Sequence, residues 1–372
     1  MMYGLNQMGV FFSLTSIGPC ILITLICLSG SHPGMVCLCG RAISDNLRIM
    51  LNHETRNLSY KSWQDFSITH LYDKAHASIT FQSMITSLLM EGATDAVNLL
   101  RSRFVGFLGE VSIGDPAEQP LADFLTTEGV LLRPDIYTPC YQMASALIDE
   151  LVRQFVIPQK FPNTPSLHLP ARPGDGGLVV LEVLTESLKF FDKSLLRLAA
   201  IHSYKPSKVK IDGYCAVQVP RESVYDTELI RILTNWLVKQ GAFTVTGHWH
   251  LRTGLDNDKY CDIVNLIKKP KMPTIVLELL ATGDPSFVRA RIDKTPYYKE
   301  LFSADEAWVV HFTCEDHYLT DPIWQSDEQL EKEGINVVHF WHDLDFSTMS
   351  MSACWKDANG HIQQVDNQLL AL

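Results

Sequence analysis

The sequence lacks the signatures of several common protein classes. It contains no GxxxxGK[ST] phosphate-binding loop, no GxGxxG dinucleotide fingerprint, no internal repeat and no low-complexity tract. Its nine cysteines are scattered without a CxxC pair, which argues against a disulfide framework and against a cysteine-rich zinc site. The net charge is −11 and neither half of the chain is basic. Any binding of nucleic acid therefore needs a local basic patch.

Charged residues are also missing from the first forty positions of the chain. The stretch from Gly9 to Gly30 is uncharged and about as long as a membrane helix. It is a poor secretory signal because no basic residue precedes it, and Gly18-Pro19 weakens it as a helix. Residues 1–40 are expected to form an apolar N-terminal segment. This segment is a membrane helix, an entry signal for secretion, an apolar soluble stretch or a false start of the gene model, so localisation stays open between membrane-associated, secreted and intracellular.

The rest of the chain has the composition of a globular protein. Its 372 residues are 46% apolar and 20% charged, which suits two domains of ordinary size. Residues 60–157 show mainly helical spacing around a short hairpin and predict a winged-helix-like region. Such a unit is either a DNA reader or a connector, and the acidic Asp149-Glu150 pair favours the connector. Residues 158–177 contain five prolines and predict an extended, semi-rigid linker.

Residues 178–372 predict an α/β (α+β) domain with a mixed sheet. A brace helix is expected from Leu178 to Ala200, followed by a helix from Ser223 to Gln240. The expected order after that is three strands, a helix and a further strand. The predicted elements are strand 243–249, a hairpin of 260–267 and 274–280, helix 285–302, strand 307–312, strand 336–341 and an edge strand 351–355.

Three carboxylates fall on this predicted core. Asp262 and Glu278 lie in the two apolar arms of the hairpin, where an isolated buried charge costs much free energy. Glu228 lies four residues before Ile232 on the preceding helix and is expected to face the sheet. Three carboxylates in one pocket need a hard cation, and Mg²⁺ is the natural candidate. The alternative is that each acid is paired with an arginine or lysine that fixes the packing.

The element order and its acids resemble the PD-(D/E)XK nuclease superfamily, which implies a restriction-endonuclease-like αβββαβ core. In that superfamily Asp262 would match the aspartate of the second core strand, Glu278 the acid of the third, and Glu228 the acid of the first helix. Longer segments resemble the C-terminal nuclease-like module of Crinkler-type effector proteins, from about residue 204 to the end. They are VPRESVYDTELIRILTNWL, YCDIVN, PTIVLELLATGD, KTPYYKELFSADEAWVVHFTCED and VVHFWHD.

The resemblance implies a Mg²⁺-dependent hydrolase that cleaves DNA, in an effector that reaches a host cell and meets a host protein partner. Asp262 and Glu278 would ligate the metal, with Glu228 as a supporting acid. The piece from residue 124 to 158 is similar to the end of the NTPase-plus-winged-helix region that precedes this module. The P-loop NTPase itself is missing, because the chain has no phosphate-binding loop.

The sequence departs from the nuclease motif at one position. The lysine expected two residues after Glu278 is Leu280. A lysine there would position and polarise the attacking water. Lys294 on the following helix is the expected substitute, and Arg289 and Arg291 are the other candidates. Two further interpretations stay open: an inactive nuclease fold that serves as a nucleic-acid or protein interaction module, and a membrane-tethered protein of unknown role.

Overall fold

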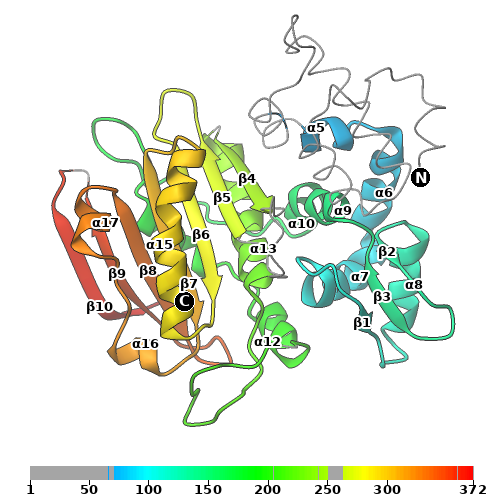
Figure 1. Cartoon of the computed structure of the whole chain (residues 1–372). Coiled ribbons are helices and arrows are strands. Elements are labelled where there is room, and N and C mark those ends of the chain that lie inside the picture. Colours follow the sequence, from blue (N-terminus) through cyan, green and yellow to red (C-terminus); the bar gives the residue numbers. More distant parts are fainter. Residues whose placement is uncertain are drawn as a thin grey trace, which may run out of the picture. The chain divides into compact units, whose positions relative to one another are not determined.

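The computed structural model describes residue 66 and residues 71–203, 205–241, 243–249, 263–357 and 359–371 (Figure 1). Contacts divide the chain into two compact units. Among the described residues, the first unit contains 71–99 and 106–157, and the second contains 100–105 and the chain from Pro158 onward. The stretch Gly9 to Gly30 lies outside the described residues, and within them no helix is long and apolar enough to cross a membrane.

The first unit is mainly helical and carries a small antiparallel sheet of order β1-β3-β2. Its elements are α5 (Leu71–His76), α6 (Ile79–Leu89), η3 (Glu91–Ala93), α7 (Thr94–Leu99), β1 (Val111–Ser112), α8 (Gln119–Thr127), β2 (Leu131–Leu132), β3 (Cys140–Met143), α9 (Ala146–Leu151) and η5 (Val152–Val156). The short helix α10 (Ile157–Lys160) follows at the boundary of the two units.

The acidic pair Asp149-Glu150 lies inside the first unit. Asp149 is buried and accepts a hydrogen bond from the backbone N–H of Gly106 at 3.0 Å. Glu150 is also buried and pairs with Arg153 at 3.5 Å. The expectation that this acidic pair disfavours DNA binding is therefore wrong, because neither carboxylate is exposed.

The second unit contains a seven-stranded mixed sheet, which confirms the predicted α/β class. The strand order is β10-β9-β8-β7-β6-β5-β4. The pairs β6–β7 and β7–β8 are parallel, and all others are antiparallel. The strands are β4 (Thr244–Trp249), β5 (Ile263–Lys268), β6 (Ile275–Ala281), β7 (Glu306–Thr313), β8 (Ile335–His342), β9 (Met349–Lys356) and β10 (Ile362–Leu370). The predicted hairpin thus appears as β5 and β6.

Strand β9 was predicted to be the edge of the sheet, and this is wrong. β10 pairs with it along nearly its whole length, from Ile362 opposite Lys356 to Leu370 opposite Met349. β10 has the sequence IQQVDNQLL, in which most side chains are exposed. Because such a strand buries little apolar surface, its sequence carries a weak hydrophobic signal, and its place is set by backbone pairing with β9.

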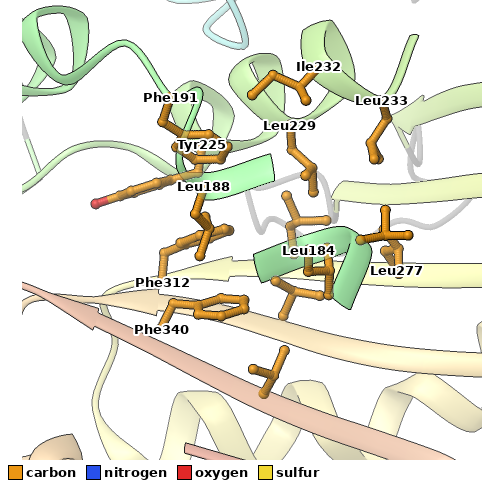
Figure 2. Packing of buried hydrophobic residues seen from close by; sticks show 14 of the residues in the cluster. Leu184, Leu188, Phe191, Tyr225, Leu229, Ile232, Leu233, Leu277, Phe312 and Phe340 are labelled. Atoms are coloured by element: carbon orange, nitrogen blue, oxygen red, sulfur yellow. The ribbon is translucent and has the colours of Figure 1, made fainter. Parts of the chain in front are cut away.

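Helices cover both faces of this sheet. They are α11 (Val180–Leu188), α12 (Lys193–Ile201), α13 (Glu222–Leu233), its continuations η6 (Thr234–Val238) and α14 (Lys239–Gly241), α15 (Pro285–Leu301), α16 (His317–Thr320) and α17 (Asp327–Glu331), together with the π-helical turn η4 (Leu100–Phe104). The main core lies between the sheet and α11–α13. Figure 2 shows Leu184 and Leu229 facing Leu277 and Phe312. Burying each such leucine stabilises the fold by roughly 1.5–3 kcal/mol.

The single brace helix expected from Leu178 to Ala200 is two helices. The chain breaks between α11 and α12, where the side chain of Asp192 accepts the backbone N–H of Leu195 at 3.1 Å and caps α12. Aspartate is a favoured N-cap residue because its carboxylate satisfies one of the unpaired amides of the first turn. The apolar residues keep their helical spacing across the break, so their periodicity predicted one helix and did not reveal this cap.

The proline-rich segment 158–177 begins in α10 and has neither helix nor strand over residues 161–170, and it belongs to the second unit and is bonded to it. Arg231 donates through Nη1 to the carbonyls of Phe161 (3.1 Å) and Asn163 (2.7 Å). Trp236 Nε1 donates to the carbonyl of Leu167 at 3.1 Å, and Asn235 to that of Pro158 at 2.8 Å. Carbonyls of an extended segment have no partners of their own, and side chains of α13 and η6 satisfy them here.

Candidate active site

Glu278 lies in the middle of β6 and points away from the main core. Leu277 and Leu279 belong to the core against α13, so the alternation of a strand turns Glu278 toward the other face, which α15 covers. Its side chain is fully buried. Arg291 Nη1 donates to Glu278 Oε1 at 2.9 Å. Glu278 Oε2 is buried and has no hydrogen-bond partner among the described residues.

A second carboxylate approaches the same guanidinium from the start of α13. Glu222, in the first turn of that helix, lies 3.8 Å from Arg291 Nη2, and its side chain is 15% exposed. The backbone N–H of Ala281, at the end of β6, donates to Glu222. Glu222 and Glu278 therefore flank Arg291 at the carboxyl end of β6, where ligand and catalytic sites of open α/β sheets are usually found.

Ionising the carboxyl groups of both Glu222 and Glu278 is electrostatically unfavourable. Burial raises the pKa of Glu278 well above its ordinary value, the nearby carboxylate of Glu222 raises it further, and Lys294 opposes the shift. Burial also raises the pKa of Glu222, against the charges of Arg291 and Lys205. Two buried carboxyls with raised pKa values hold a proton between them or a cation beside them.

A half-buried lysine completes the cluster. Lys205 Nζ donates to the carbonyl of Ala281. Burial lowers the pKa of Lys205, while Glu222 and Glu315 act in the opposite direction. Glu315 lies two residues after the end of β7, is fully buried, and accepts the backbone N–H of Val209 at 3.1 Å. A lysine with a lowered pKa loses its proton more easily than a surface lysine.

The loop after β6 is held tightly at this place. Thr282 has φ 38°, a left-handed conformation that is rare and costly for a β-branched residue. Its backbone N–H donates to the carbonyl of Phe312 at 2.8 Å, and Tyr318 OH donates to the carbonyl of Gly283 at 2.7 Å. Asp284 then caps α15 by accepting the N–H of Phe287 at 2.9 Å. Strained residues that the surroundings hold in place concentrate at functional sites.

Glu228 does not lie in this cluster, so the expected convergence of Glu228 with Glu278 is wrong. Glu228 is fully buried and accepts Arg101 Nη2 at 2.6 Å and Arg231 Nη2 at 2.8 Å. It also accepts the backbone N–H of Asp192 at 2.9 Å. Six residues along a helix correspond to about 9 Å of rise and roughly 240° of rotation, so Glu222 and Glu228 occupy different faces of α13.

The other predicted site residues have separate outcomes. Asp262 lies outside the described residues, directly before β5 in sequence, and the β5–β6 register places Val264 opposite Glu278. Lys294 is near enough to lower the pKa of Glu278, and its Nζ lies 5.4 Å from the centre of the Tyr298 ring. Leu280 is fully buried on the same face of β6 as Glu278, so the position of the motif lysine is filled by an apolar side chain.

Two members of the cluster were missed from the sequence. Glu222 was passed over because it precedes the apolar stripe of α13, although acidic residues are common in the first turn of a helix. Lys205 lies close in sequence to Lys208 and Lys210, and such a basic cluster is usually solvated. Only Lys208 and Lys210 are exposed. No sequence pattern distinguishes the lysine that turns inward.

Comparisons with known proteins add no relative to this description. No protein-family model matches the chain, and no curated protein or solved structure matches it. The structure defines an α/β protein with a mixed seven-stranded sheet and a buried carboxylate pair at the end of its parallel strands. The chemistry of the cluster has to be argued from its own residues.

Proposed function

We propose that the second unit is a Mg²⁺-dependent phosphodiesterase of the PD-(D/E)XK type that acts on DNA, as the resemblance to Crinkler-type effectors implies. The observation that carries the proposal is the pair of carboxylates formed by Glu278, which is fully buried, and Glu222, whose side chain is 15% exposed. They come from the helix and the third strand of an α13-β4-β5-β6-α15-β7 order and share one site at the end of β6. Glu222 takes the place that sequence reasoning gave to Glu228.

The residues fit a hard divalent cation. Among the described residues no three metal-ligating side chains form a group, but Mg²⁺ is commonly held by one or two carboxylates together with waters and substrate phosphate. Glu278 Oε2 is a buried carboxylate oxygen without a hydrogen-bond partner in the described part of the chain. We propose Asp262 as the second ligand, with Glu278 as the first. A bound Mg²⁺ would supply charge stabilisation at the phosphate and an activated water.

The remaining side chains have roles that follow from their charge. Arg291 contacts both carboxylates and is placed to neutralise a phosphate oxygen when the carboxylates are engaged elsewhere. Lys205, with its lowered pKa, is a candidate for the proton transfer that the missing motif lysine would perform. Lys294 is the second candidate, since its charge reaches Glu278 from the exposed side of α15.

Plasmid cleavage by the full chain tests the proposal. With Mg²⁺, supercoiled DNA should be nicked by the natural sequence, and Asp262→Ala or Glu278→Gln should lower the rate at least a hundredfold. Comparing Lys205→Met with Lys294→Met identifies the lysine that takes part. Glu328→Gln is the matched control, because Glu328 is an exposed glutamate on α17 that pairs with the exposed Lys332 at 3.1 Å. Cleavage that needs no metal, or that persists equally in Asp262→Ala, would refute the proposal.

One observation favours a second candidate function, an inactive nuclease fold kept as an interaction module. Arg291 already pairs with both Glu222 and Glu278, and Leu280 fills the position of the lysine. Titration calorimetry separates the two. Saturable binding of Mg²⁺ or Mn²⁺ that is lost in Glu278→Gln supports the enzyme, whereas no heat of binding up to millimolar metal supports the module.

The first unit is proposed to be winged-helix-like and to act as a connector. The order α7-β1-α8-β2-β3 and the sheet order β1-β3-β2 support this description. In such a fold α8 would be the helix that reads DNA. Its sequence, QPLADFLTT, contains no lysine or arginine, and its Asp123 pairs with Arg133 at 3.5 Å. A helix without basic residues is a poor reader of DNA.

A further inference from the structure

A pocket of about 760 Å³ opens in the second unit, apart from the Glu222–Glu278 cluster. It is lined by Arg101 of η4, by residues 160–164 of the proline-rich segment, by residues 189–193 between α11 and α12, and by Arg231 of α13. We call it the basic pocket. Its volume lies within the range of ordinary small-molecule sites.

The lining of the basic pocket is strongly cationic in a chain of net charge −11. Five of its residues are cations: Arg101, Lys160, Lys189, Lys193 and Arg231. One is an acid, Asp192. The two arginines are held by the carboxylate of Glu228, and Lys189 pairs with Glu186 at 2.7 Å, so Lys193 keeps a positive charge that these acids do not offset. This excess favours an anionic ligand.

The lysine best placed to meet such a ligand is Lys193. It is half-buried, and within the described part of the chain it has no hydrogen-bond or ion-pair partner. It is also the first residue of α12, a helix of nine residues. Asp192 caps the amide of Leu195 there, and the amides of the first turn before Leu195 carry a partial positive charge that binds phosphate oxygens readily. The ammonium group of Lys193 and the start of α12 therefore both favour a phosphate group.

The walls of the pocket are partly aromatic. Phe161 and Phe190 are both half-buried and belong to the lining. The guanidinium of Arg101 lies over the ring of Phe161, with its central carbon 4.0 Å from the ring centre. An aromatic surface beside cations suits a ligand that combines a planar ring with a phosphate.

We propose that the basic pocket binds a nucleotide, with the phosphate on Lys193 and the start of α12 and the base against Phe161. A single open pocket of this volume fits a mononucleotide. A nucleic-acid strand would instead need a basic groove that continues along the surface. The proposal does not depend on the Mg²⁺ site, because Glu228 beneath the pocket and Glu222 in the cluster lie on different faces of α13.

Titration calorimetry of the full chain at physiological salt tests the proposal with three probes: ADP, pyrophosphate and an eight-nucleotide single-stranded DNA. ADP should bind at one site and more tightly than either other probe. Lys193→Ala and Phe161→Leu should each weaken ADP binding about tenfold, since each removes one principal contact. Lys332→Ala, at an exposed lysine on the flank of α17, should leave it unchanged.

Three outcomes would overturn the proposal: no binding of ADP, pyrophosphate binding as tightly as ADP, or the oligonucleotide binding more tightly than ADP. ADP binding that survives Lys193→Ala unchanged would also overturn it. Unfolding midpoints equal to that of the natural sequence will show that the variants fold. Glu278→Gln should keep full ADP binding, so a failure of the nuclease proposal and a failure of this one are distinguishable.

Discussion

Replacing Glu228 with glutamine should destabilise the second unit strongly. The carboxylate is fully buried and accepts four hydrogen bonds, from Arg101 Nη2 (2.6 Å), Arg231 Nε (3.2 Å), Arg231 Nη2 (2.8 Å) and the N–H of Asp192 (2.9 Å). Glutamine removes the charge and turns an N–H₂ group toward these donors. Breaking a buried ion pair by removing one partner costs about 3–5 kcal/mol, and we expect that loss of unfolding free energy.

Urea unfolding at pH 7, followed by tryptophan fluorescence, measures this loss. Six of the seven tryptophans lie in the second unit, so the signal reports that unit. The exposed-site variant Glu328→Gln should show no measurable change, because surface ion pairs contribute little. Glu278→Gln should cost less than about 1 kcal/mol, because the raised pKa of Glu278 already favours the neutral acid, which glutamine resembles.

The pH dependence gives the prediction a second test. Burial alone raises the pKa of Glu228, but Arg101 and Arg231 outweigh it and hold this pKa below its ordinary value of 4.5. The stabilisation is therefore complete above the unfolded-state pKa and is lost as the pH falls through the lower folded-state pKa. The difference in unfolding free energy between the natural sequence and Glu228→Gln should become smaller in acid. A loss below 1 kcal/mol at pH 7, or a gap that stays constant in acid, would refute the reasoning.

Three further changes test other parts of the structure. Because the folded-state pKa of Glu278 is raised, its stabilising effect is present below the unfolded-state pKa and fades as the pH rises. In urea unfolding above pH 4.5, the free energy of unfolding of Glu278→Gln should therefore rise relative to that of the natural sequence. A difference that stays constant with pH would contradict this. Leu280→Lys buries an amine and should lower the unfolding free energy measured in urea by about 2 kcal/mol or more. It should nevertheless increase Mg²⁺-dependent nicking, with Leu280→Met as its control. Unchanged nicking would count against the hypothesis that Leu280 stands at the position of the motif lysine. Arg231→Lys should break the hydrogen bonds that Arg231 donates to carbonyls of segment 158–177. Limited trypsin digestion should then cut this segment faster than in the control variant Lys332→Ala. Equal cleavage rates would show that other contacts hold the segment.

Local pattern was sufficient for the elements that bury apolar side chains. The hairpin of β5 and β6 was predicted from two β-branched runs around a Lys/Pro turn, and the structure has it. α15 was predicted over 285–302 and spans Pro285–Leu301, with a proline in its first turn and the Asp284 cap before it. In these cases the propensity of the segment and its burial favour the same structure.

The same reasoning failed where apolar burial gives no signal. β10 exposes most of its side chains, so only its pairing with β9 makes it a strand. The brace helix was predicted as one piece because the apolar stripe continues past Asp192, whose capping role depends on the chain turning there. Neither feature could be read from periodicity.

By itself, the sequence determined the α/β class, the order of elements around the hairpin and the burial of Glu278, because these follow from runs of apolar residues. Only the tertiary structure decided which acid joins Glu278. Glu222 and Glu228 are acids of one helix, the first partly and the second fully buried, and their spacing alone does not say which of them reaches the end of β6. The fold brings Arg101, 127 residues away, to Glu228 beside Arg231 of the same helix, and it places Arg291 of α15 beside Glu222.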